Sequence, residues 1–263
     1  MHKNFVLLSH AVTILFLITI IVFSSFISNV YGHATPVSYS PSANSIFTQN
    51  GSLPTKVVIL FSERPEPKVS YIHVTNAENN RIDNNDYAIT GQNDRQATVT
   101  LDNNKLAPGV YTVSWLALSR DDGHITKGSY VFTIKSAQTA AQTVSSNQNN
   151  NTFSDQVTID NVNLQYKITP FYAGVGNSFN VTLTDASGKS PTNIKNVIIQ
   201  FNNKQAGIGP VVANLDKLEN GIYSTEGGYL SQPGEWDIKI IVQRNEAYDL
   251  NHSFKVTVKA PPP

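Results

Sequence analysis

The chain has 263 residues, which is enough for one or two domains with hydrophobic cores of their own. Its 19 lysine and arginine residues balance 19 aspartate and glutamate residues, which argues against nucleic-acid binding because a phosphate-binding surface needs an excess of basic residues. The chain has no cysteine, and its single methionine is Met1, so disulfides, thiolate metal sites and thioether ligands after the start are excluded.

The first 32 residues have the three parts of a secretory signal peptide. A short basic start precedes an uncharged apolar run, AVTILFLITIIVF, and the segment Val30-Tyr31-Gly32 forms a processing site before His33. We therefore predict cleavage after Gly32 and an extracytoplasmic mature protein, either in a periplasm or equivalent space or secreted. The alternative is a retained anchor helix, because residues 5–30 carry no charge. We predict no membrane span in the mature chain.

Residues 33–135 form a first block rich in predicted β-strands. These strands are short, rich in valine, isoleucine and tyrosine, and bounded by proline, glycine or asparagine. Their regular spacing and the lack of a sustained helical period predict a β-sandwich of the Greek-key or immunoglobulin-like kind. The candidate strands cover residues 56–62, 69–75, 96–102, 110–118 and 129–135.

A polar tract separates this block from a second one. Residues 136–156 carry a single charge and few bulky apolar side chains, which predicts a flexible linker. Residues 157–259 again show strand patterns, and the tail at 260–263 is expected to be disordered. The whole chain is thus predicted to be all-β, with two sandwiches joined by a linker. The candidate strands of the second block cover residues 178–185, 196–202, 221–227, 236–244 and 253–259.

His33 becomes a potential metal chelator if cleavage follows Gly32. Its free α-amine and the Nδ1 atom of its ring could then close a six-membered chelate on one ion. Nitrogen ligands in a tetragonal arrangement suit Cu(II), which also heads the affinity order of divalent first-row metals. The alternative is that a histidine follows the cleavage site by chance.

A second candidate half-site lies in the segment SRDDGHITKGSY. Asp122 and His124 stand two residues apart, so a carboxylate and an imidazole can lie on one side of an extended segment or turn. Gly123 between them lets the backbone pass close beneath a ligand. The alternative is an ordinary hairpin turn, in which Asp121 and Asp122 accept hydrogen bonds from backbone amides and His124 is merely exposed.

Taken together, these segments resemble the copper-resistance proteins of the CopC type. The resemblance rests on HATPVSYSPSANSIF at the start of the block, VVILFSE in its middle and LAPGVYTVSWLALSRDDGHITKGSYVFTI at its end. These motifs occur in the family's order and span residues 33–135, the whole first block.

This resemblance implies a site for one Cu(II) ion per chain, formed by His33, Asp122 and His124. Glu63, the glutamate of the Phe-Ser-Glu motif, is a weaker candidate because it lies near the copper in some family members. The segment before His124 is one residue longer than in the simplest members, so Asp121 could replace Asp122. The methionine-rich Cu(I) site of some members has no counterpart, because no methionine follows Met1.

The remaining features of the chain are interpreted as structural. His73 alternates with neighbours on a predicted strand, and His252 has no second histidine near it in sequence. The second block is similar to YtkA-like immunoglobulin-type domains and offers no catalytic constellation, so we expect an interaction or spacer module.

We therefore predict a carrier that buffers or delivers copper and is not an enzyme, with a separate CopD-type membrane protein as partner. Two alternatives stay open. A lytic polysaccharide monooxygenase also uses an N-terminal histidine chelate, although the Asp122 carboxylate would favour Cu(II) and discourage redox cycling. A structural surface protein without metal is the other alternative.

Overall fold

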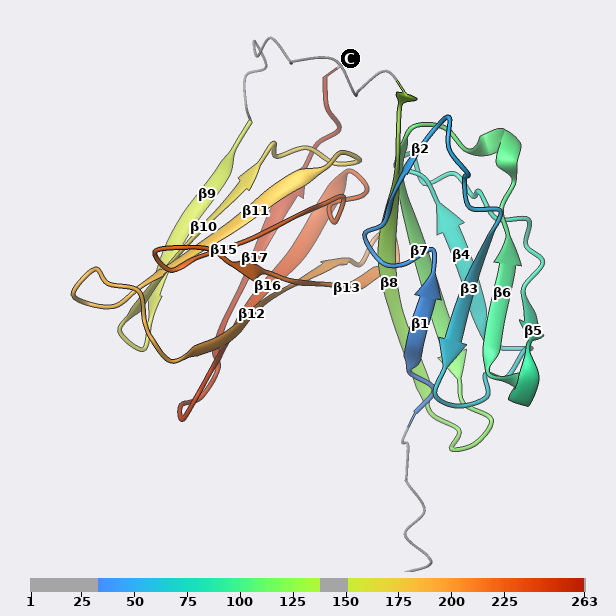
Figure 1. Cartoon of the computed structure of the whole chain (residues 1–263), viewed down its shortest axis with the longest axis horizontal. Helices are drawn as coiled ribbons and strands as arrows, with labels where there is room; N and C mark the ends of the chain where they lie inside the picture. The colour runs from blue at the N-terminus through green and yellow to red at the C-terminus, as the bar shows by residue number, and fades with distance from the viewer. Residues whose placement is uncertain (1–32, 138–150, 263) are drawn as a thin grey trace, which may run out of the picture. The chain divides into compact units, whose positions relative to one another are not determined.

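The computed structural model of the chain describes residues 33–137 and 151–262 (Figure 1). The predicted signal peptide and most of the predicted linker lie outside these residues. The described segments belong to one compact unit, His33–Pro263. Among them, no helix has both the length and the hydrophobicity of a membrane span.

The first block folds into two four-stranded sheets that face each other (Figure 1). All neighbouring strands are antiparallel except β2 and β8, and two short 3-10 helices, η1 (Gln92–Asp94) and η2 (Asn103–Lys105), lie in its connections. One sheet has the order β1 (Pro36–Ser40), β3 (Lys56–Phe61), β6 (Gln96–Thr100) and β5 (Ala88–Thr90). The other has the order β2 (Ile46–Thr48), β8 (Ile125–Lys135), β7 (Gly109–Leu118) and β4 (Tyr71–Thr75).

The second block also consists of two facing sheets (Figure 1). One has the order β14 (Asp216–Lys217), β15 (Ile222–Gly227), β11 (Asn177–Thr184), β10 (Val162–Thr169) and β9 (Phe153–Ile159). The other has the order β13 (Ile208–Asn214), β12 (Ile194–Asn203), β16 (Gly234–Arg244) and β17 (Leu250–Val258). The predicted all-β class with two sandwiches is confirmed.

The core of the first block follows from alternation along its strands. In β3, residues 57, 59 and 61 are buried while their neighbours are more exposed, as expected for strands with one face on a core. Phe61 packs edge-on against Trp115 of the opposite sheet, with 5.5 Å between ring centroids. Tyr111 and Phe132 are cross-strand neighbours and stack at 5.0 Å, so aromatic contacts join β7 to β8 and, through Trp115, β7 to the opposite sheet.

The predicted start of the second block needs correction. Residues 153–156, predicted to be part of the linker, form the beginning of β9 and pair with β10. The reason is Phe153, whose ring stacks on Phe171 at 5.1 Å and on Phe254 at 5.9 Å, so this polar strand has an apolar anchor. Residues 260–262 form no helix or strand, Ala260 and Pro261 line a cavity, and the disorder expected for the tail stays a prediction.

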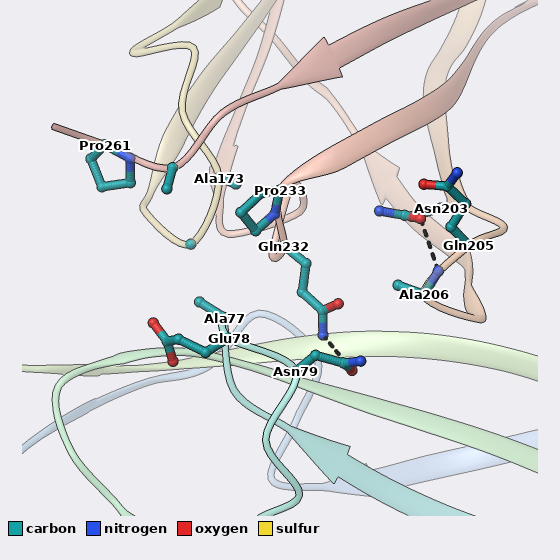
Figure 2. A pocket seen from close by; sticks show the side chains of 12 residues that line it. Ala77, Glu78, Asn79, Ala173, Asn203, Gln205, Ala206, Gln232, Pro233 and Pro261 are labelled. Carbon is teal, nitrogen blue, oxygen red and sulfur yellow. Dashed lines mark hydrogen bonds between the residues drawn. The ribbon is translucent and has the colours of Figure 1, made fainter.

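Within the compact unit, the second block contacts the outer face of the β7–β8 hairpin. Val110 and Val131 are buried in the hydrophobic cluster of the second block, whereas the neighbouring residue Tyr111 points into the first. Figure 2 shows the Gln232 side chain, which donates a hydrogen bond to Asn79 Oδ1 at 3.3 Å. These contacts lie near the start of β7, and the loop after Leu118 is at the other end of the same strand.

Gly128 allows a test of the packing around Trp115 in the core of the first block. A Cβ atom at residue 128 would lie 2.8 Å from the Trp115 ring. We predict that Gly128→Ala lowers the free energy of unfolding by about 1–3 kcal/mol through overpacking. Urea unfolding followed by tryptophan fluorescence measures the change. Gly176→Ala is the matched control, because nothing lies within 4 Å of its added Cβ. Equal stability of the two variants would contradict the packing described for Trp115.

Candidate metal centre

Residues 119–124 form a tight loop that connects β7 to β8. The backbone N–H of Ser119 donates to the His124 carbonyl at 2.8 Å, and the Gly123 N–H donates to the Ser119 carbonyl at 3.1 Å. Gly123 has a φ of 76°, a conformation that glycine adopts without steric cost. The loop therefore presents the side chains of Asp122 and His124 at the end of a rigid hairpin.

His33 reaches this loop from the opposite end of the block's sequence. It directly precedes β1, and the segment is held in place because Thr126 Oγ1 donates to the Ala34 carbonyl and Ser62 Oγ donates to the His33 carbonyl at 2.9 Å. The His33 backbone nitrogen donates to Asp122 Oδ2 at 2.8 Å, across a sequence separation of 89 residues. β1 pairs with β3 in one sheet, and the Thr126 contact joins its approach to β8 of the facing sheet, so the packing of the two sheets brings the segments together.

Three side chains converge at this point. Asp122 Oδ2 lies 3.1 Å from His33 Nδ1 and 3.1 Å from His124 Nδ1. One potential ligand atom from each of the three residues lies within 4.8 Å of the others. The centroids of the two imidazole rings are 4.5 Å apart. The side chains of His33 and His124 are 49% and 63% exposed, so an ion could reach them from solvent.

The electrostatics of the loop favour an ionised carboxylate at Asp122. The backbone N–H of His124, which donates to Asp122 Oδ1 at 2.9 Å, contributes most to lowering the pKa of the Asp122 carboxyl. Hydrogen bonds from the His33 ring and backbone nitrogen lower this pKa further. The cluster thus combines two imidazoles with one negative charge, a donor set suited to divalent transition metals.

Asp121, the alternative to Asp122, points elsewhere. Its carboxylate pairs with the Arg64 guanidinium and also accepts the Arg64 backbone N–H at 3.0 Å. Two guanidinium N–H groups of Arg64 donate to Asp121 Oδ1, and these hydrogen bonds are the main cause that lowers the pKa of Asp121. Among the described residues, the three-residue metal-ligand cluster contains Asp122 and not Asp121.

Glu63, the weaker candidate, also lies outside that cluster. Its side chain is buried, with the residue 8% exposed, and its Oε2 accepts a hydrogen bond from Ser119 Oγ at 2.6 Å. The carboxylate is therefore directed at the base of the loop. Sequence reasoning missed this role of Ser119, and also the contacts of Ser62 and Arg64, although the Phe-Ser-Glu motif marked the right segment.

The other two histidines of the described chain lie apart from the cluster. His73 is half-buried on β4 and stacks on Tyr71 with 4.4 Å between ring centroids, and burial is the main cause that lowers its pKa. His252 lies on β17, where its Nε2 is 3.2 Å from the Tyr166 hydroxyl. Both make packing contacts that fit the structural role predicted for them.

Comparison with known proteins identifies a family match in the first block. The CopC domain model matches residues 37–135. Protein YobA of Escherichia coli K12 is 35% identical over 107 residues, which cover 41% of this chain and 82% of YobA. Protein YobA of Shigella flexneri matches with the same identity and coverage.

Two solved structures are also similar to part of this chain. CopC from Methylosinus trichosporium OB3b has a TM-score of 0.35 and 28% identity, covering 40% of this chain and 97% of CopC. PcoC, a methionine-rich copper resistance protein from Escherichia coli, has a TM-score of 0.33 and 25% identity, covering 40% of this chain and 100% of PcoC. The family match ends at Lys135, and the resemblance of the second block to YtkA-like domains stays a prediction. Through residues 37–135, and through its identity to relatives of which it covers most of the length, the chain belongs to the CopC domain family.

Proposed function

We propose that this protein binds one Cu(II) ion outside the cytoplasm and buffers or delivers it. The ligands are the amine and Nδ1 of His33, a carboxylate oxygen of Asp122 and the imidazole of His124. The observation that supports this most is the convergence of these three residues within 4.8 Å, from both ends of the first block. Copper is the cargo in this proposal, and its release is as much a part of the function as its capture.

The donor set explains why copper is the metal proposed. Imidazole and amine nitrogens suit Cu(II), which binds nitrogen and oxygen sites most tightly among divalent first-row ions. The Asp122 carboxylate supplies negative charge and so favours Cu(II) over Cu(I). No methionine follows Met1, so thioether ligands for Cu(I) are absent from residues 33–263. This charge balance favours storage and transfer of Cu(II) over the redox cycling of an oxidative enzyme.

The site depends on processing of the chain after Gly32. Before cleavage the His33 nitrogen is a peptide amide, a poor ligand whose N–H is engaged with Asp122 Oδ2 at 2.8 Å. After cleavage the same nitrogen becomes an amine beside that carboxylate, and it can form a chelate with Nδ1 of the same residue. We propose that the leader peptide directs export and keeps the site inactive until export. A separate CopD-type membrane protein is the proposed recipient.

A pair of proteins that differ by one residue tests the chelate. One begins at His33 and the other carries a single glycine before it. We predict that the extra residue weakens Cu(II) binding by more than the roughly 10–100-fold that loss of a supporting residue costs a metal site. Competition titration with a chelator of known affinity measures the difference. Equal tight binding by both proteins would contradict the proposed role of the amine.

Substitutions at the side-chain ligands form a second test, made in the protein that begins at His33. We predict that Asp122→Ala and His124→Ala each weaken Cu(II) binding by at least about 10-fold, because each removes a ligand. Asp121→Ala is expected to have a smaller effect, since the Asp121 carboxylate is paired with Arg64. His252→Ala is the control and leaves binding unchanged. A larger loss with Asp121→Ala than with Asp122→Ala would reverse the choice between them.

The oxidative alternative has a direct test. Copper-loaded protein is incubated with ascorbate and oxygen, and peroxide formation and polysaccharide cleavage are measured. We predict no rate above that of the Asp122→Ala, His124→Ala double variant with the same total copper. Peroxide formation or glycan cleavage that depends on the intact site would contradict the carrier proposal.

A further inference from the structure

The three residues that follow β3 contact both halves of the candidate metal centre. Ser62, Glu63 and Arg64 leave the sheet next to β1. Ser62 forms hydrogen bonds with the His33 segment, and Glu63 and Arg64 form hydrogen bonds with the 119–124 loop. None of the three belongs to the cluster of potential ligands found among the described residues. We refer to residues 62–64 as the brace.

Ser62 holds the His33 segment. Its hydroxyl donates to the His33 carbonyl at 2.9 Å and accepts the Thr35 backbone N–H at 3.0 Å. The backbone N–H of Ser62 donates to the Thr35 carbonyl at 2.8 Å. Residues 33–35 are thus tied to the brace through bonds on both sides of Ala34, which is itself fully buried. These bonds hold the His33 carbonyl, and the backbone nitrogen of the same residue bonds to Asp122.

Glu63 holds the loop through Ser119. The Ser119 hydroxyl donates to Glu63 Oε2 at 2.6 Å and accepts the backbone N–H groups of Asp121 at 3.0 Å and Asp122 at 3.2 Å. One donor and two acceptor positions are all that a hydroxyl offers, so this hydroxyl is fully used. The Glu63 carboxyl oxygen fixes the direction in which this hydroxyl points. The backbone on which Asp122 stands is therefore anchored to a buried side chain.

Arg64 adds a third attachment on the far side of the loop. Its carbonyl accepts the Arg120 backbone N–H at 2.8 Å, and its guanidinium pairs with Asp121. The Arg64 pairing also holds the second carboxylate of the loop away from the cluster. Two adjacent aspartates therefore have different tasks, with Asp121 engaged by the brace and Asp122 left to face the two histidines.

We propose that the brace is a positioning device that holds His33 and Asp122 at ligand spacing before an ion arrives. In this proposal Glu63 acts through Ser119 and is not a ligand. The inference rests on the proposed function, because it concerns the same site. Its physical basis is preorganisation: a site assembled in advance loses less conformational freedom on binding and therefore binds more tightly.

The test uses Glu63 variants of the protein that begins at His33. We expect Glu63→Ala to weaken Cu(II) binding by about 10–100-fold and to speed dissociation, as loss of a supporting residue does. Glu63→Gln keeps an oxygen acceptor for Ser119 and is expected to weaken binding less. The electron paramagnetic resonance spectrum of bound Cu(II) should be unchanged in both variants, because the ligands are the same.

Asp86→Asn is the matched control. Asp86 also accepts a hydroxyl hydrogen bond, from Thr100 Oγ1 at 2.6 Å, but it bonds to β6 and not to the site. We expect its Cu(II) affinity to equal that of the parent protein. If Glu63→Ala fails to fold, Ser62→Ala tests the other arm of the brace, with the same expected loss of affinity and an unchanged spectrum.

The outcomes separate the inference from the function on which it rests. Unchanged affinity in Glu63→Ala and Ser62→Ala would overturn the brace while leaving the proposed function intact. An altered copper spectrum in Glu63→Gln would show that Glu63 is a ligand, which also overturns the inference. Lack of tight Cu(II) binding by the parent protein would instead overturn the proposed function itself.

Discussion

The candidate site depends on one carboxylate oxygen. Asp122 Oδ2 lies within 3.1 Å of two nitrogen atoms of His33 and of Nδ1 of His124, so it joins the beginning and the end of the first block. A contact of this kind between residues 89 apart cannot form from local structure alone. It requires the sandwich to bring β1 and the β7–β8 hairpin together, and it explains why the fold and the site are inseparable.

The hairpin supplies rigidity where the site needs it. Trp115 and Phe132 anchor β7 and β8 in the core, and the second block covers the outer face of the same strands near their other end. The loop at 119–124 is short, and Ser119 ties it to a buried glutamate. Exposed imidazoles thus stand on a backbone that is well fixed, which is the arrangement that capture of a solvent ion requires.

Much of the fold could be predicted from the sequence, because valine- and isoleucine-rich strands with alternating burial are easily recognised. The strands β2 and β5 have only three residues each, which is too short for an alternation of apolar and polar residues to be recognised. The sequence pattern assigns the first residues of β9 to the linker because they follow an asparagine-rich segment. The strand is nevertheless anchored by Phe153, which stacks on Phe171. The structure brings the expected segments of the site together. The contacts of Asp121 with Arg64 and of Glu63 with Ser119 are not encoded in spacing along the chain.

The most direct test of Cu(II) binding by His33 and His124 is to identify the nitrogen ligands of the bound copper. Pulsed electron paramagnetic resonance would be recorded on the Cu(II)-loaded protein that begins at His33, with and without ¹⁵N-labelled histidine. The account predicts coupling to two imidazoles and to the His33 amine, with both imidazole couplings lost in the His33→Ala, His124→Ala double variant. A spectrum in which the imidazole couplings survive that double substitution would place the copper at other histidines and contradict the account.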